Sequence, residues 1–236
     1  MWPIPVPLLL PFVGSALAAL LPPNARNREA WLAGVVTLAG VLVMGLQYPA
    51  IAAGEVLHYE VPWLPGLGLS FSLRLDGFAW QFAMLVLVIG LLVVLYARYY
   101  MSPSDPVPRF FAFFLAFMGS MLGIVLSGNL VQLAMFWELT SLMSFLLIGY
   151  WHHRPDARRG ARMALVITVA GGLCLFAGVL MMGQVAGGYE LDRVLASGEL
   201  IRAHPWYRPM LVLIALGALT KSAQFPFHFW LPRAMA

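Results

Sequence analysis

Two ionisable residues, Glu138 and Lys221, lie inside otherwise apolar segments and could exchange protons. Glu138 stands in the run LVQLAMFWELTSLMSFLLIGYW, and Lys221 follows the apolar run from Met210 to Ala218. A charged side chain at bilayer depth costs a few kcal/mol or more, so such a residue usually marks a functional site. These two residues are therefore the first candidates for chemistry in this chain.

The segment that carries Lys221 also carries a helix-breaking residue. Pro226 has no N–H, and its ring clashes with the carbonyl four residues earlier, that of Ser222. We therefore predict a break or kink just after Lys221, which frees carbonyls that need polar partners. A broken helix with an ionisable group at mid-depth is typical of an ion pathway. The alternative is a proline-kinked helix whose lysine snorkels to the surface.

Glu138 and Lys221 are expected at comparable depth. Glu138 lies eight residues past Leu130 and Lys221 twelve past Pro209, which at about 1.5 Å per residue places them ~12 Å and ~18 Å along their helices. Opposite charges ~4 Å apart attract by about 4 kcal/mol at an effective dielectric of ~20. We predict a pair whose separation lets the lysine release its proton. The alternative is that each charge meets a separate polar partner.

Three further polar residues are candidates for the same proton path: Gln132, Gln224 and His228. Gln132 precedes Glu138 by six residues, which is too far round the helix for direct contact. His228 changes charge near neutral pH and could relay protons, although a histidine hydrogen-bonded between helices fits equally.

The composition favours an all-α polytopic membrane protein. Of 236 residues, 61% are hydrophobic and 10% are charged, whereas soluble domains carry about 25% charged residues. The net charge of +4 is interpreted as a topology signal and not as a nucleic-acid surface. His152 and His153 have no cysteine or acid at ligand spacing, so neither a metal nor another cofactor is expected. The lone Cys174 is interpreted as a small core residue.

Seven apolar segments are long enough, or nearly so, to span a bilayer, which takes about 20 residues. They cover approximately Pro5–Leu21, Trp31–Tyr48, Gly77–Tyr99, Phe110–Leu126, Leu130–Tyr150, Met163–Ala186 and Pro209–Leu231. We therefore predict about seven transmembrane helices, the seventh of them discontinuous. The first segment is not interpreted as a signal peptide, because a signal peptide begins with a positively charged region and no Lys or Arg precedes Arg26.

Arginines in the connections predict the orientation. On one side lie eight of them: Arg26, Arg28, Arg98, Arg109, Arg154, Arg158, Arg159 and Arg162. On the other side, four arginines are offset by six carboxylates: Glu55, Glu60, Asp76, Glu190, Asp192 and Glu199. The positive-inside rule then places the eight in the cytoplasm and the N-terminus outside the cytoplasmic membrane.

Two outer connections show patterns of their own. From Leu69 to Asp76 apolar and polar residues alternate, which indicates a strand. Tyr59–Trp63 supplies a partner and Pro65–Gly68 a turn, so a small extracytoplasmic β-hairpin is predicted. Between Glu190 and Ile201 the apolar residues fall near one helical face, which predicts a short helix on the membrane surface that stops at Pro205.

Two segments resemble the signature segments of the antiporter-like membrane proteins. They are FWELTSLMSFLLIGYW, residues 136–151, and LTKSAQFPFHFWLPRAMA, residues 219–236. That family includes the proton-pumping subunits of respiratory complex I and the Mrp-type sodium/proton antiporters. The spelling FPFHFWLP around Pro226 and His228 is most similar to the large A-type subunit of the Mrp antiporters, and the resemblance extends along the chain.

The resemblance implies a role for each member of the charged couple. Glu138 matches the family's essential helix-5 glutamate, and Lys221 matches its helix-7 lysine on a discontinuous helix. Many complex I relatives also carry an acid on helix 6, and this chain has none at residues 168–172. The implied protein is one subunit of an ion transporter and not an enzyme. It would exchange protons for Na⁺ (or K⁺) beside other membrane subunits in the lipid bilayer.

The resemblance also implies an organisation. Residues 1–107 would hold helices 1–3 with the hairpin near 58–76, and residues 108–236 would hold helices 4–7, an incomplete first antiporter-like repeat. Family members continue past the position of Ala236, so the chain is interpreted as a truncated, N-terminal form.

Three other classes of protein fit part of the pattern. The first is the proton-translocating subunit of a complex I-type NADH:quinone oxidoreductase or membrane-bound hydrogenase. The second is a retinal protein with Lys221 as its Schiff base, against which stand Pro226 and the lack of a carboxylate within the third helix. The third is a purely structural membrane subunit, in which Glu138 and Lys221 could be replaced by apolar residues without functional loss.

Overall fold

The computed structural model describes residues 4–22, 26–64, 69–102 and 105–235. The chain divides into two compact units. The first comprises Met1–Tyr59 with Leu73–Leu126, and the second comprises Glu60–Ser72 with Ser127–Ala236. The fourth apolar segment, Phe110–Leu126, therefore lies in the same compact unit as the first three. The predicted division of the chain at residue 107 concerns its repeat organisation and stays a prediction.

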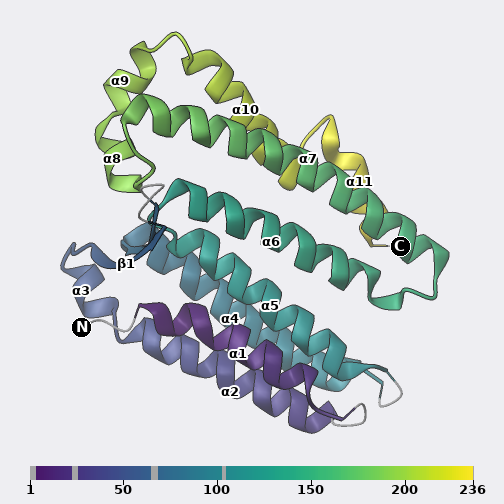
Figure 1. The fold of residues 1–236 in the computed structure, drawn as a ribbon. Helices are drawn as coiled ribbons and strands as arrows, with labels where there is room; N and C mark the ends of the chain where they lie inside the picture. Colours follow the sequence, from purple (N-terminus) through teal and green to yellow (C-terminus); the bar gives the residue numbers. More distant parts are fainter. Residues whose placement is uncertain (1–3, 23–25, 65–68, 103–104, 236) are drawn as a thin grey trace. The chain divides into compact units, whose positions relative to one another are not determined.

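The first unit is a helical bundle in which α5 packs against α1, and α2 packs against both α4 and α1 (Figure 1). Small residues let these helices approach closely: a Cβ on Gly40 of α2 would lie 2.9 Å from Leu87 Cδ2 of α4. The helices are α1 (Pro5–Ala19), α2 (Arg26–Gly45), the short α3 (Tyr48–Ala52), α4 (Gly77–Tyr100) and α5 (Val107–Leu126).

The second unit is organised around one long helix, α7. Helices α6, α10 and α11 all pack against it, α10 most extensively, and Figure 1 shows α10 running alongside α7. The elements are α6 (Leu130–Ile148), the 3₁₀ turn η2 (Gly149–Trp151), α7 (Pro155–Ala186), α8 (Leu191–Ala196), α9 (Gly198–Ala203), α10 (Tyr207–Lys221), η3 (Phe227–Phe229) and α11 (Trp230–Ala234).

The alternating sequence forms the predicted two-stranded sheet, with β1 (Leu57–Leu64) beside β2 (Leu69–Leu75). The predicted turn, Pro65–Gly68, lies outside the described residues. Gln132 of α6 holds β2 through the backbone of Ser72: Ser72 N donates to Gln132 Oε1 at 2.9 Å, and Gln132 Nε2 donates to Ser72 O at 3.0 Å. The side-chain amide of Gln132 thus makes the two hydrogen bonds with the Ser72 backbone that a neighbouring strand would otherwise make.

In the part of the chain that the structure describes, five helical segments are long and apolar enough to cross a membrane: Arg26–Ala52, Gly77–Tyr100, Val107–Leu126, Leu130–Trp151 and Pro155–Ala186. Helix α1 is apolar but shorter. These segments support the prediction of an all-α polytopic membrane protein with a small sheet, while the number of seven crossings stays a prediction.

Two predicted boundaries differ from the structure. Helix α7 begins at Pro155, eight residues before the predicted Met163, because Pro155 suits the first helical position and Asp156 favours the positive end of the helix dipole. The predicted single helix after Glu190 is instead two, α8 and α9. They are separated at Ser197, whose N–H bonds to the carbonyls of Arg193 and Val194 and closes α8.

The start of α4 depends on a charged cap. Asp76 Oδ1 accepts a hydrogen bond from Ala79 N at 2.8 Å, and Arg74 forms an ion pair with the same carboxylate. Burial opposes ionisation, but the hydrogen bonds from Ala79 and Arg74 prevail and hold the pKa of Asp76 below its ordinary 3.8. A depressed carboxyl pKa stabilises the fold above the unfolded-state pKa, and this stabilisation is lost as the pH falls through the folded value.

We expect Asp76→Asn to remove this acid dependence. Asparagine still caps a helix, so the variant isolates the charge from the cap. As the pH is lowered below about 4, the melting temperature of the wild-type chain should fall more steeply than that of the variant, measured by scanning fluorimetry in detergent. Glu55→Gln, at an exposed position, is the control and should follow the wild type. Parallel curves for Asp76→Asn and the wild type would contradict this account.

Candidate functional site

The ammonium of Lys221, at the last residue of α10, is bound by α6. Its Nζ donates to Thr140 Oγ1 at 2.6 Å, to Ser141 Oγ at 2.7 Å and to the Trp137 carbonyl at 3.1 Å. It also lies 5.4 Å from the centroid of the Trp137 ring. An ammonium has three donors, so this set of acceptors satisfies all of them.

The three acceptors of Lys221 come from one face of α6. Residues 137, 140 and 141 stand at i, i+3 and i+4, which brings them together on a helix. Thr140 Oγ1 and Ser141 Oγ donate to the Trp137 carbonyl at 2.7 and 3.3 Å. Their hydroxyl hydrogens therefore point to the backbone, and their lone pairs are available to the ammonium.

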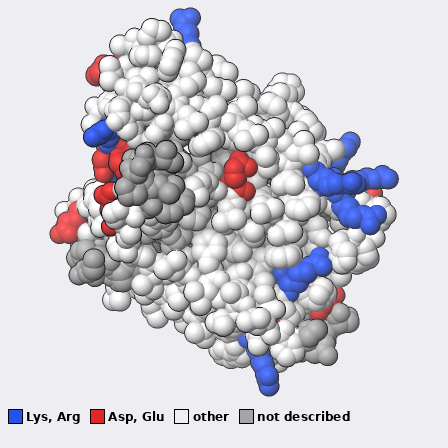
Figure 2. All heavy atoms as spheres, in the orientation of Figure 1, with Lys and Arg blue, Asp and Glu red and all other residues white. Residues whose placement is uncertain are grey.

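Glu138 points to a different neighbour. The side chain is half-buried, and its Oε1 is buried without a hydrogen-bond partner among the described residues. A Cβ on Gly172 of α7 would stand 1.5 Å from this oxygen, so the carboxyl group occupies the space that Gly172 leaves open. In the orientation of Figure 1, Figure 2 shows acidic atoms in the otherwise uncharged region over α6 and α7.

Two consecutive glycines of α7 bring the helices of Glu138 and Lys221 together. A Cβ on Gly171 would lie 1.7 Å from Thr220 Oγ1 of α10, next to Lys221, and Gly172 accommodates Glu138 of α6. Glu138 and Thr220, the residue before Lys221, thus pack against adjacent glycines of α7. The hydrogen bonds of the ammonium run to the α6 hydroxyls and the Trp137 carbonyl, however, and not to the Glu138 carboxylate.

Helix α10 ends at Lys221, five residues before Pro226. The chain then turns through Ala223, which has a φ of 51°. Gln224 N donates to Leu219 O at 3.0 Å, and the indole of Trp230 on α11 donates to Thr220 O at 2.9 Å. Carbonyls at the end of α10, which have no partner within the helix, thereby find donors beyond the break.

Among the described residues, the three weaker candidates form no hydrogen bond with Glu138 or Lys221. Gln132 uses its amide to hold Ser72 and also donates to Ser127 Oγ at 3.2 Å. Gln224 and His228 follow the end of α10 and are exposed, and the ring of His228 lies 5.8 Å from that of Phe225. Within the described ranges, no cluster of three or more His, Cys, Asp or Glu side chains could hold a metal ion.

The residues that sequence reasoning missed are Thr140 and Ser141. The available signal was their position two and three residues after the buried glutamate, on the helical face shared with Trp137. Hydroxyl residues are common in membrane helices, so this spacing alone does not reveal that an ammonium from another helix binds there.

Two family models match this sequence. One, described as "NADH:quinone oxidoreductase/Mrp antiporter, TM", matches residues 127–236. The other, described as "NADH-Ubiquinone oxidoreductase (complex I), chain 5 N-terminus", matches residues 63–111. The first match contains Glu138, Lys221 and the hydroxyls that bind the lysine.

Individual proteins show the same similarity. A probable K⁺/H⁺ antiporter A/B subunit of Rhizobium meliloti (strain 1021) is 63% identical over 97% of this chain and 23% of its own length. A "Putative antiporter subunit mnhA2" of Staphylococcus aureus (strain MRSA252) is 40% identical over 93% of this chain and 28% of its own length. This chain therefore spans about a quarter of the length of these relatives.

Solved structures agree with these similarities. A chain of the Mrp complex from Dietzia sp. DQ12-45-1b superposes with a TM-score of 0.84 at 35% identity, over 98% of this chain and 25% of that chain. A chain of the membrane-bound sulfane sulfur reductase, an archaeal respiratory membrane complex, superposes with a TM-score of 0.80 at 22% identity, over 98% of this chain and 36% of that one. The second likeness shows the shared fold alone.

We expect Gly172→Ala to disturb the site. The new methyl group would overlap the Glu138 carboxyl, so that side chain must move or α6 must separate from α7. Overpacking of this kind costs about 1–3 kcal/mol, which should appear as a lower melting temperature. The matched control is Gly34→Ala in α2, where the nearest atom, Val94 Cγ1, lies 4.0 Å away. Equal stability of the two variants would show that Glu138 does not pack against Gly172.

Proposed function

The chain belongs to the family of A-type Mrp antiporter subunits, and we propose that it carries one lysine-centred step of proton transport in a multi-subunit cation/proton antiporter. The observation that carries the proposal is the Lys221 ammonium at a helix end, bound by α6 hydroxyls beside the buried Glu138 carboxyl. A helix that stops at an ionisable group is typical of ion pathways. Such a subunit is a transporter component and not an enzyme.

The exchanged cation is proposed from the relatives. The Rhizobium protein is named for K⁺/H⁺ exchange, and the resemblance of the sequence to Mrp-type antiporters points to Na⁺. Protons together with Na⁺ or K⁺ are therefore the proposed substrates, and the other subunits of the same complex are the proposed partners. The alternative, a proton-translocating subunit of a redox-driven complex, is supported by the shared fold, by one half of the description of the model over residues 127–236, and by the complex I model over residues 63–111.

The proposed step moves Lys221 between two environments. In the first, its ammonium is held by Thr140, Ser141 and the Trp137 carbonyl. In the second, it lies next to the Glu138 carboxylate, where an approach to ~4 Å is worth about 4 kcal/mol at an effective dielectric of ~20. The two environments hold the lysine proton with different strength, so movement between them drives the proton one step. Gln224 and His228 are the proposed continuation after the break.

The proposed topology has seven crossings. Helix α1 is the first, and α10 with α11 forms a discontinuous seventh, which is supported by the packing of both against α7. In the second unit, basic side chains gather at the end that holds the start of α7 (Figure 2). The positive-inside rule then favours a cytoplasmic location for that end and an extracytoplasmic N-terminus in the cytoplasmic membrane.

Replacement of either charge should abolish transport. We expect Glu138→Gln and Lys221→Ala, made in the full-length protein within its complex, to assemble normally and to lose at least about nine-tenths of the cation-dependent proton flux. The flux is measured by a pH-gradient dye in membrane vesicles to which Na⁺ or K⁺ is added. Glu199→Gln, at an exposed carboxylate, is the control. Assembled complexes of either charge variant that transport at the full rate would rule out the proposal.

The hydroxyl acceptors allow a finer test. A hydrogen bond to a charged group contributes about 1.5–3 kcal/mol, so Thr140→Val should weaken the first environment of Lys221 by between about tenfold and about a hundredfold. We expect slower transport and a shifted pH profile. Thr140→Ser, which keeps the oxygen, should restore both. If valine and serine give the same profile, Thr140 is not an acceptor for the ammonium during transport.

A further inference from the structure

The first turn of α2 carries a carboxyl group that the molecule encloses completely. Glu29 is 0% exposed, although Asn27 and Arg28 directly before it are exposed. Both of its carboxyl oxygens are buried and have no hydrogen-bond partner among the described residues. Buried polar groups in folded proteins are nearly always hydrogen-bonded, so a buried carboxyl group without a partner requires a physical explanation.

The side of α2 that carries Glu29 faces the interior of the first unit. Val36, Thr37 and Gly40 follow it by seven, eight and eleven residues, which places all three within about a quarter turn of Glu29 around the helix. Val36 packs against α1, Thr37 against α5 and Gly40 against α4. Glu29 therefore points between the three helices that surround α2.

Apolar side chains fill the end of the first unit at which α2 begins. Arg26 Nη1 donates to Met101 O at 3.0 Å, which places the start of α2 beside the end of α4. The chain passes from there into α5, and the side chains of Ala97, Met101, Val107 and Phe111 are at most 6% exposed. None of these side chains can solvate a carboxylate.

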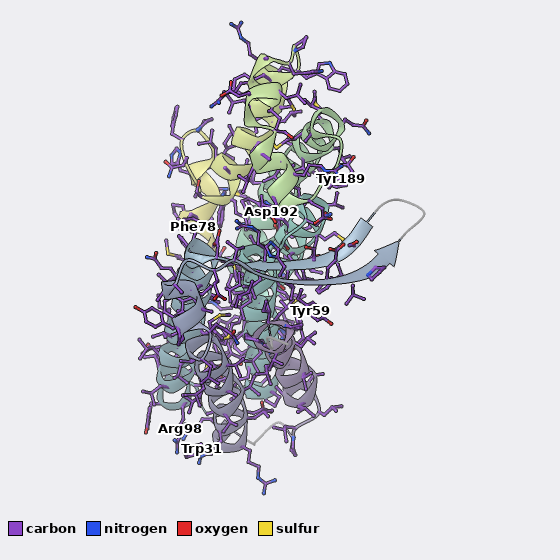
Figure 3. The ribbon with its side chains drawn as sticks, turned by 90° about the vertical axis from the view of Figure 1, so that its left-hand side faces the viewer. Trp31, Tyr59, Phe78, Arg98, Tyr189 and Asp192 are labelled. Carbon is purple, nitrogen blue, oxygen red and sulfur yellow. The ribbon has the colours of Figure 1, made fainter. Side chains whose placement is uncertain are left out.

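The ionisable groups on the helices around Glu29 have other neighbours. Helix α1 carries none. On α4, the guanidinium of Arg98 lies 5.4 Å from the Trp31 ring and 5.6 Å from the Tyr99 ring, and Figure 3 shows Arg98 beside Trp31. On α5, the guanidinium of Arg109 lies 5.9 Å from a phenylalanine ring of its own helix. The other ionisable side chains at this end are exposed or bond within their own connection: Arg28, Tyr96, Tyr99, Tyr100 and Asp105.

No polar side chain of α2 continues from Glu29 into the bundle. The next one along the helix is Thr37, which is eight residues away, or ~12 Å at about 1.5 Å per residue. Its hydroxyl donates to Ala33 O at 2.7 Å and lies 3.8 Å from Met118 Sδ. A proton on Glu29 therefore exchanges with the exposed start of α2 and not with the middle of the bundle.

The ligand that fits this carboxyl group is a proton. An ionised carboxylate that is buried without a partner is far more costly than the neutral acid, because the ion loses much more hydration. The start of a helix favours an anion, but by less than this cost. A hard metal cation needs several oxygen ligands, whereas the described residues offer only the two oxygens of Glu29.

We propose that Glu29 is a proton-binding site of the first unit, which carries a proton at neutral pH and exchanges it with the aqueous phase at the start of α2. The packing of this helix end into the bundle then takes up one proton. Glu29 belongs to the first unit, whereas Glu138 and Lys221 belong to the second. The site is therefore independent of the proposed transport step.

Infrared difference spectroscopy of the full complex in lipid tests the protonation state. The spectrum of the wild type minus that of Glu29→Gln should show the carbonyl band of a protonated carboxyl group at neutral pH, and carboxylate bands only at alkaline pH. The matched control, Glu55→Gln at an exposed position, should show carboxylate bands at neutral pH. Carboxylate bands for Glu29 at neutral pH would overturn the proposal.

The stability of the complex gives a second measurement. A glutamate of an unfolded chain ionises above about pH 4.3, so a proton that stays bound in the fold makes stability fall as the pH rises. The ratio of folded to unfolded protein then falls by up to about tenfold per pH unit. Glu29→Met is neutral and lacks this dependence. Between about pH 5 and pH 7, the melting temperature of the wild type should fall relative to that of the variant.

Two outcomes of this measurement contradict the proposal. The first is a difference in melting temperature between wild type and Glu29→Met that stays constant with pH, since it shows that no proton is taken up at Glu29 on folding. The second is a failure of both neutral variants, Glu29→Gln and Glu29→Met, to assemble, since it shows that the fold requires the charged form.

Discussion

The solvation of one ammonium inside an apolar bundle organises the second unit of this protein. An ammonium among apolar side chains needs polar partners that those side chains do not provide. Here α6 provides three oxygens, from Trp137, Thr140 and Ser141, and α10 ends at the residue that carries the charge. The helix end places the ammonium at the α6 face and leaves carbonyls in need of donors, and Trp230 of α11 supplies one of these. The charge and the discontinuity therefore depend on each other.

This arrangement requires that three helices approach closely, and α7 makes the approach possible. Gly171 and Gly172 face α10 and α6 on adjacent positions of one helix, and a methyl group at either would overlap Thr220 or Glu138. The hydrophobic effect contributes little to helix association in lipid, so membrane helices depend on close van der Waals packing. Small residues such as these glycines allow the backbones to approach closely enough for it. The absence of a side chain at Gly172 leaves the space that the Glu138 carboxyl occupies.

How far the sequence predicts this site depends on the kind of residue. Glu138 and Lys221 stand out because charge in an apolar run is rare, and the strands stand out because polarity alternates. Thr140 and Ser141 could not be identified, since their role arises only when α10 brings a cation to them. The apolar run of the sequence begins at Met163, so the start of α7 was predicted there. The helix itself begins at Pro155 and includes the arginines that precede Met163. The amide of Gln132 holds Ser72 of the hairpin, and the part of Gln132 in a proton path stays a prediction.

The two charges of the site are satisfied unequally, and the proposed proton step relies on this asymmetry. All three donors of Lys221 have acceptors, whereas Glu138 Oε1 is buried without a partner among the described residues. A direct, fully hydrogen-bonded pair would be costly to separate, because separation leaves two uncompensated buried charges. In the proposed step the hydroxyls of α6 compensate the ammonium for its departure from Glu138, and the carboxyl group is left to take up a proton or a cation. The hydroxyls thus lower the cost of the separation on which a proton step relies.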